Sequence, residues 1–194
     1  MPRWLGWAAT AVGIPLGLFF FQHWWSRRPQ GERQAPMPMD NPPSGPLVYP
    51  EPQPIDAEQL FTLLAEVGDL ARWQAAPLVG EAVLANPGGT VIGNNPARLR
   101  AGSTWPGAWT SIRTAALISG QPRHQWTPIR SYPSMRMGVT DWLNAIPSRA
   151  YAALLEGDAH EFARVLVDAG QIQSDPAVYA AYLAEATAPW LDPA

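Results

Sequence analysis

The strongest pattern near the start of the chain is an apolar run. Residues 4–25 read WLGWAATAVGIPLGLFFFQHWW and contain no Asp, Glu, Lys or Arg. A helix of this length crosses the roughly 30 Å hydrocarbon core of a bilayer. Tryptophans stand at both ends of the run, where aromatic side chains favour the membrane–water interface; they are Trp4, Trp7, Trp24 and Trp25. The pattern predicts a transmembrane helix over residues 4–25.

A cleaved signal peptide is the alternative interpretation of this run. It requires a shorter apolar core and a small-x-small cleavage site, and no such site follows residue 25. Arginines at 27, 28 and 33 favour a cytoplasmic position for the following domain, but Arg3 flanks the other end, so the orientation stays open. Gly13 and Gly17 have the GxxxG spacing of associating membrane helices, which suggests self-association as a further hypothesis.

A proline-rich segment follows the apolar run. Residues 26–54 contain nine prolines and few large apolar residues. Such a composition keeps the chain extended and semi-rigid, without a core of its own. We therefore predict a linker over residues 26–54 and a domain over residues 55–194.

Within the domain, apolar positions recur mainly at helical spacing. Helices are predicted to begin at Asp56, near Pro77, before Val139, and at Ser148, Asp158 and Asp175. The first ends at Gly68 and the second near Ala85. Residues 86–133 are rich in Gly, Pro, Trp, Ser and Thr, and predict loops and short strands. The fold class is therefore mainly α, with an irregular middle.

Composition excludes several function classes. The net charge of −3 and the lack of a basic block argue against a nucleic-acid partner. The chain has no cysteine, so disulfides, zinc–thiolate sites and cysteine nucleophiles are ruled out. The three histidines are scattered, no P-loop or Gly-x-Ser-x-Gly elbow is present, and no metal or other cofactor is predicted.

Four segments together point to a family. They are LVGEAVLANPGG (78–89), GNNPARLRAG (93–102), IRSYPSMRMGVTDWLNAI (129–146) and YAALLEGDAHEFARVLVDAGQIQSDPAVYAAYL (151–183). In this order and spacing they resemble the glucosaminidase family of peptidoglycan hydrolases, and the paired asparagines are also similar to the NNPGN loop of phage wall-degrading proteins. Ala97 departs from the glycine of that loop.

The resemblance implies a lysozyme-like domain that acts on a peptidoglycan glycan strand. Together with the predicted membrane helix at residues 4–25, it implies a membrane-anchored location: an inner membrane with a periplasmic domain, or the internal membrane of a phage particle. The family places an acidic residue at the end of the helix before the Gly-rich break, and this chain has Ala85 there. Glu81, four residues earlier and on the same helix face, is the candidate for a displaced acid.

The remaining candidate site residues come from the motif match and from the tryptophans of the irregular middle, whose rings could stack on sugars. Tyr132 matches an active-site tyrosine of the family, and Arg130 belongs to the same motif. Candidate substrate-binding residues are Asn94, Asn95, Trp105, Trp109, Trp126 and Arg130. For the asparagines the alternative is to fix the loop through hydrogen bonds, and for the tryptophans it is packing. Asp141 is predicted to be a surface residue of an amphipathic helix.

Two functional hypotheses remain open from the sequence. In the first, the chain is a degenerate wall-binding or structural module, because Ala85 cannot deliver a proton. In the second, it is an active glycoside hydrolase that cleaves β-1,4 bonds with Glu81 as the acid and Tyr132 assisting. The orientation of Glu81 relative to Tyr132 distinguishes the two hypotheses.

Overall fold

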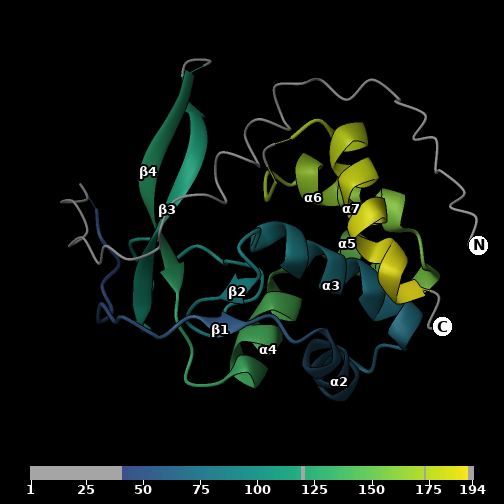
Figure 1. Cartoon of the computed structure of the whole chain (residues 1–194), viewed down its shortest axis with the longest axis horizontal. Coiled ribbons are helices and arrows are strands. Elements are labelled where there is room, and N and C mark those ends of the chain that lie inside the picture. The colour runs from purple at the N-terminus through teal and green to yellow at the C-terminus, as the bar shows by residue number, and fades with distance from the viewer. Residues whose placement is uncertain (1–40, 119–120, 173, 192–194) are drawn as a thin grey trace, which may run out of the picture. The chain divides into compact units, whose positions relative to one another are not determined.

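The computed structural model describes residues 41–118, 121–172 and 174–191 (Figure 1). All described residues belong to one compact unit. The predicted membrane helix at 4–25, with Gly13 and Gly17, lies outside the described residues. None of the helices in the described part combines the length and the apolar character needed to cross a bilayer.

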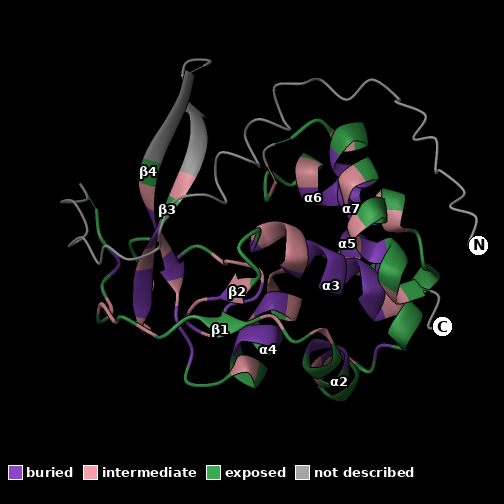
Figure 2. Cartoon of the chain, in the orientation of Figure 1, coloured by how far each residue is buried: buried purple, intermediate pink, exposed green. Residues whose placement is uncertain are grey.

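The domain is built around one central helix, α3 (Arg72–Ala85). Every residue of α3 from 75 to 82 is buried, and Figure 2 shows the helix largely in the colour of buried residues. The other helices are α2 (Ala57–Gly68), α4 (Met135–Ala145), α5 (Ser148–Glu156), α6 (Ala159–Asp168) and α7 (Pro176–Leu191). Helices α2, α5 and α7 pack directly against α3.

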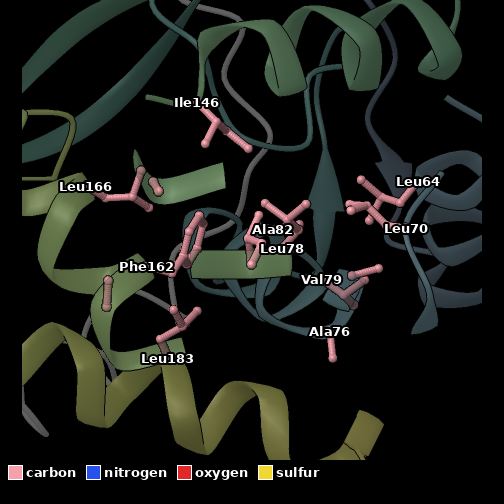
Figure 3. Close-up of a cluster of buried hydrophobic side chains, with 14 of the residues drawn as sticks. Leu64, Leu70, Ala76, Leu78, Val79, Ala82, Ile146, Phe162, Leu166 and Leu183 are labelled. Atoms are coloured by element: carbon pink, nitrogen blue, oxygen red, sulfur yellow. The ribbon is translucent and has the colours of Figure 1, made fainter. Parts of the chain in front are cut away.

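The hydrophobic core lies between these helices. Leu78 and Ala82 of α3 meet Phe162 of α6 and Leu183 of α7 in one cluster (Figure 3). All four side chains are almost completely excluded from solvent. Burial of a large apolar side chain stabilises the fold by about 1.5–3 kcal/mol, so this cluster fixes the position of α3 and of the loop that follows it.

Several predicted helix starts are confirmed by their capping bonds. The Asp56 side chain accepts a hydrogen bond from the backbone N–H of Gln59 at 3.0 Å. Asp158 accepts one from Glu161 at 2.9 Å, and Asp175 caps α7 in the same way. Each carboxylate satisfies an amide at a helix start that has no partner within the helix.

The predicted start of the second helix near Pro77 is wrong. Helix α3 begins five residues earlier, at Arg72, where the Gln74 side chain accepts a hydrogen bond from the Ala71 N–H at 2.9 Å. Pro77 is therefore inside the helix, where it removes one backbone hydrogen bond. Burial on all sides leaves α3 without an amphipathic period, so the sequence pattern did not reveal its first turns.

The middle of the chain is more regular than the predicted loops and short strands. Strands β3 (Trp109–Ile118) and β4 (Gln121–Arg130) form an antiparallel hairpin of ten residues each, seen as a two-stranded ribbon in Figure 1. Its register runs from Trp109↔Arg130 to Ile118↔Gln121. A second, short sheet pairs β1 (Gln53–Pro54) with β2 (Thr90–Val91).

The end of the proline-rich segment lies on the domain. We call Ser44–Pro54 the N-terminal strap. Its Gly45 N–H donates to the Trp105 carbonyl at 3.0 Å, and its Val48 N–H donates to the Trp109 carbonyl at 2.8 Å. The Trp109 indole N–H donates to the Gly45 carbonyl at 2.8 Å. The contacts of the domain therefore begin before residue 55.

Candidate functional site

The Asn94–Asn95 loop connects α3 to the segment that carries Tyr132. The Asn94 side chain donates to the Tyr132 carbonyl at 2.8 Å, and the Tyr132 N–H donates to the Gly93 carbonyl at 2.8 Å. The fully buried Asn95 amide donates to the carbonyls of Leu99 at 3.0 Å and Arg130 at 2.9 Å. Both asparagine side chains are thus used to hold backbone, which is the structural role considered for them.

Glycine at position 138 lets α4 approach this loop closely. A Cβ atom added to Gly138 would lie 1.8 Å from the Asn94 carbonyl oxygen, so no larger residue fits there without backbone movement. The hydroxyl of Ser134 accepts from the Met137 N–H and starts α4 two residues after Tyr132. Helix α4 is therefore set directly against the loop and the tyrosine.

Four side chains then converge, and we call them the tyrosine cluster: Trp105, Arg130, Tyr132 and Asp141. Asp141 Oδ2 accepts hydrogen bonds from the Tyr132 hydroxyl and, at 2.6 Å, from Arg130 Nη1. The Arg130 guanidinium lies 4.4 Å from the Trp105 ring centroid, a cation–π geometry. The Trp105 and Tyr132 rings meet edge to face with centroids 6.2 Å apart.

The environment keeps the Tyr132 hydroxyl protonated. Burial, followed by the hydrogen bond to Asp141, raises the pKa of Tyr132 well above its ordinary value. Burial lowers the pKa of Arg130, but its contact with Asp141 outweighs this effect and the net pKa is raised. The cluster thus presents a neutral phenol and a cation, both oriented by one carboxylate.

Asp141 corrects a prediction from the sequence. It was expected at the surface, but its side chain is 29% exposed and accepts two hydrogen bonds within the cluster. Its spacing showed only that it lies off the apolar face of α4. The indirect signal was its place in the same motif segment as Arg130 and Tyr132, nine residues after the tyrosine.

Glu81 lies elsewhere, on the side of α3 that packs against α7. Glu81 is 8% exposed to solvent, and its Oε2 atom is buried without a hydrogen-bond partner. Burial raises the pKa of Glu81 to about 8. The pKa of Tyr179 on α7 is raised mainly by the burial of Tyr179 itself, and further by the charge of the nearby Glu81. Among the described residues, no hydrogen bond or charge interaction joins Glu81 to Tyr132, so the structure does not pair the two predicted catalytic residues.

The end of α3 has no carboxylate of its own. Ala85 is the last residue of the helix and is half-buried. The next residue, Asn86, is buried; its amide donates to the carbonyls of Ala82 at 2.8 Å and Pro96 at 2.6 Å. The sequence from residue 82 to residue 140 contains no Asp or Glu. Glu81 and Asp141 are therefore the acids that flank this whole region.

The other two candidate tryptophans differ in their surroundings. Trp109 is buried and bonded to the strap through its indole N–H, which is the packing role. Trp126, on β4, is half-buried and opposite Arg113 in the hairpin ladder. Of the three predicted tryptophans, Trp105 is the one that the structure brings to Tyr132. Within the described residues, no group of three or more His, Cys, Asp or Glu side chains could hold a metal ion.

Comparison with solved structures shows the fold. The chain matches a peptidoglycan hydrolase mutant from Sphingomonas sp. A1 with 24% identity and a TM-score of 0.55, over 68% of this chain and 90% of that one. Two structures of the glycoside hydrolase domain of FlgJ from Salmonella typhimurium match with 22% and 20% identity and TM-scores of 0.42 and 0.44. They cover 69% and 70% of this chain, and 97% and 88% of theirs.

No protein-family model and no curated protein matches the chain. The domain is thus a helical domain with small sheets that shares the fold of a peptidoglycan hydrolase. The predicted resemblance to peptidoglycan hydrolases is confirmed at the level of the fold.

Proposed function

We propose that this chain is a membrane-anchored, peptidoglycan-binding module that has a hydrolase fold but lacks the proton donor. The observation that carries the proposal is Ala85 at the end of α3, in a region without acidic residues from 82 to 140. Cleavage of a glycosidic bond requires an acid within hydrogen-bond reach of the leaving oxygen. A methyl group cannot supply that proton.

The tyrosine cluster supports binding without cleavage. The Trp105 ring is half-buried, and the Arg130 and Asp141 side chains are 27% and 29% exposed, so polar groups and an aromatic ring reach solvent together. Binding sites commonly combine an aromatic surface with a few oriented polar groups. A glycan strand of peptidoglycan, with its many hydroxyl and amide groups, fits this combination.

An active hydrolase with Glu81 as the acid is the second candidate. In its favour, the pKa of Glu81 is raised to about 8, so the side chain carries a proton at neutral pH. Against it, Oε2 is fully buried and Glu81 interacts with Tyr179 on α7 rather than with the tyrosine cluster. A substrate oxygen would need to reach a position inside the α3–α7 contact.

The test uses the full-length chain with purified cell walls. We expect it to co-sediment with the walls without releasing soluble fragments, and expect Trp105→Ala to reduce binding about tenfold, because it removes the ring beneath Arg130. Glu81→Gln is expected to bind like the wild type.

Wall digestion that disappears in Glu81→Gln would establish the second candidate, the active hydrolase. Absence of binding to the walls would remove peptidoglycan as the ligand. Digestion gained by Ala85→Glu would show that a missing acid is the main defect.

The location is part of the same proposal. A wall ligand requires a periplasmic domain on an inner membrane, or an anchor in the internal membrane of a phage particle. Because the chain has no cysteine, one introduced at the exposed Ser103 is a unique label. In spheroplasts, a maleimide that does not cross membranes should modify Ser103→Cys if the domain is periplasmic. Protection until detergent is added would place the domain inside, as the arginines at 27, 28 and 33 favour.

A further inference from the structure

Arg98 carries a charge that no carboxylate of the described residues neutralises. It follows the Asn94–Asn95 loop, it is partly buried, and burial lowers its pKa. Buried charges are normally paired with an opposite charge. Five described arginines form ion pairs with carboxylates: Arg72, Arg130, Arg136, Arg149 and Arg164. Arg98 forms none with any described residue.

The guanidinium of Arg98 is nevertheless held in one place. Its Nε donates to Asn86 Oδ1 at 2.9 Å. Asn86 is itself fixed by hydrogen bonds to the carbonyls of Ala82 and Pro96. Neither Nη atom has a partner among the described residues, and neither is among the fully buried polar atoms that lack one. Both Nη atoms therefore keep some exposure to solvent, on a guanidinium whose Nε is bonded to Asn86, the residue that follows Ala85.

The backbone of Arg98 is held in an unusual conformation. Its φ is 51°, in the left-handed region that favours glycine, whereas Ala97 has no positive φ. A non-glycine residue in this region costs roughly 1–3 kcal/mol, and such residues cluster at binding sites. The loop residue with a φ typical of glycine is thus Arg98, and its side chain brings a cation to the end of α3.

The surrounding sequence has the charge of an anion site. Residues 82–140 contain six arginines and no Asp or Glu. Arg130 and Arg136 are paired with Asp141 and Glu66, which lie outside that segment. The overall net charge of −3 conceals this local excess of positive charge.

We propose that Arg98 binds a carboxylate of the peptide part of peptidoglycan, beside Ala85. With Nε bonded to Asn86, the two Nη groups present a pair of parallel N–H donors that matches the two oxygens of a carboxylate. This inference rests on the proposed function, and it names the chemical group that the site recognises. A single guanidinium edge suits the single charge of a carboxylate, whereas the phosphate contacts of nucleic-acid-binding proteins involve several basic residues.

The experiment measures binding of the full-length chain to a soluble disaccharide-peptide from peptidoglycan by titration calorimetry. The ligand is used with free carboxylates and with the same carboxylates amidated. We expect amidation to weaken binding to the wild type by about tenfold or more, the loss typical of one charge-assisted hydrogen-bonded contact. In Arg98→Gln, both forms are expected to bind equally and weakly. Arg113→Gln is the matched control, because Arg113 is exposed and has no ion pair with a described residue.

A second variant separates binding from folding. Arg98→Gly removes the guanidinium but suits the positive φ, so it should fold and still lose the discrimination between the two ligands. Equal binding of both ligand forms to the wild type, or unchanged discrimination in Arg98→Gly, overturns the carboxylate proposal and leaves the wall-binding function standing. If the wild type binds neither ligand nor intact walls, both proposals fail. Displacement of the ligand by inorganic phosphate at lower concentrations than acetate would also contradict a carboxylate site.

Discussion

At the scale of single residues, Glu81 links the stability of the fold to pH. The native state holds its proton up to a pH of about 8, because burial raises its pKa from 4.5. The unfolded chain releases the same proton near pH 4.5. Between these values the native state binds more protons than the unfolded state, so its stability falls as the pH rises. The slope is about 1.4 kcal/mol per pH unit for one group.

Glu81→Gln is therefore expected to remove this slope. Glutamine is nearly the same size and stays neutral, so the variant should melt at a higher temperature than the wild type at pH 8 and similarly near pH 4.5. Thermal unfolding followed by circular dichroism from pH 4.5 to 9 measures the difference. Parallel curves for the two proteins would show that Glu81 is not buried as a neutral acid. Asp168→Asn changes an exposed carboxylate of α6 and is the control.

The individual site residues were predictable where they match positions of the family motif. Arg130 and Tyr132 follow from the motif match, and the structure places them in contact with the same carboxylate. Asp141 was not predictable from its spacing, because an amphipathic pattern shows which face of a helix is apolar but not what lies opposite its polar face. Arg98 was missed because a positive φ at an arginine has no sequence signature.

At the scale of elements, the contact between α3 and α7 depends on Gly80. A Cβ atom at position 80 would lie 2.6 Å from Thr187 Oγ1 and 3.3 Å from the Thr187 backbone nitrogen. The two helices therefore approach closely at this point, and Glu81 is enclosed at the same contact. Alanine has the better helix propensity by about 1 kcal/mol, but that gain is smaller than the cost of forcing an extra carbon between packed helices.

Gly80→Ala is expected to destabilise the domain by up to about 2 kcal/mol, which is the packing cost of about 1–3 kcal/mol less the gain in helix propensity. Thr187→Ala alone should be nearly neutral, since the Thr187 hydroxyl is buried without a partner. In the double variant, part of the loss should be recovered because the Oγ1 atom is gone. Urea unfolding of the four proteins gives the coupling energy. Additive effects would mean that α3 and α7 do not meet closely at residues 80 and 187.

The elements differ in how far the sequence revealed them. Helices with a carboxylate cap and an amphipathic face, such as α2 and α6, were predictable from both signals. The hairpin was missed because Pro122 and Pro128 lie in β4 and its polar residues obscure the alternation. The residues between the strands, Ser119 and Gly120, are a pair typical of short turns and were the available signal.

At the scale of the whole molecule, the domain includes residues that composition assigns to a linker. Prolines dominate residues 26–54, and a proline-rich composition predicts an extended chain without showing where that chain meets a folded surface. The strap binds Trp105 and Trp109 and adds β1 to β2. The composition therefore did not predict that the folded domain includes residues before 55.

A chain that begins at residue 55 is expected to be less stable than one that begins at residue 41. The shorter chain loses the partner of the Trp109 indole N–H and the hydrogen bonds of Gly45 and Val48. Each hydrogen bond contributes about 1 kcal/mol, so a loss of several kcal/mol is expected in urea unfolding. Equal midpoints and equal tryptophan fluorescence for the two chains would show that the strap does not bind the domain in solution.

The strap also determines where a mechanical load enters the domain. The Ser44 hydroxyl and the Gly45 N–H both donate to the Trp105 carbonyl, each at 3.0 Å. Tension applied to Ser44 would load these two bonds before those of Val48 and β1. Trp105 is also the ring beneath Arg130, so this load would pass to the tyrosine cluster. The strap and the tyrosine cluster are thereby joined through one tryptophan.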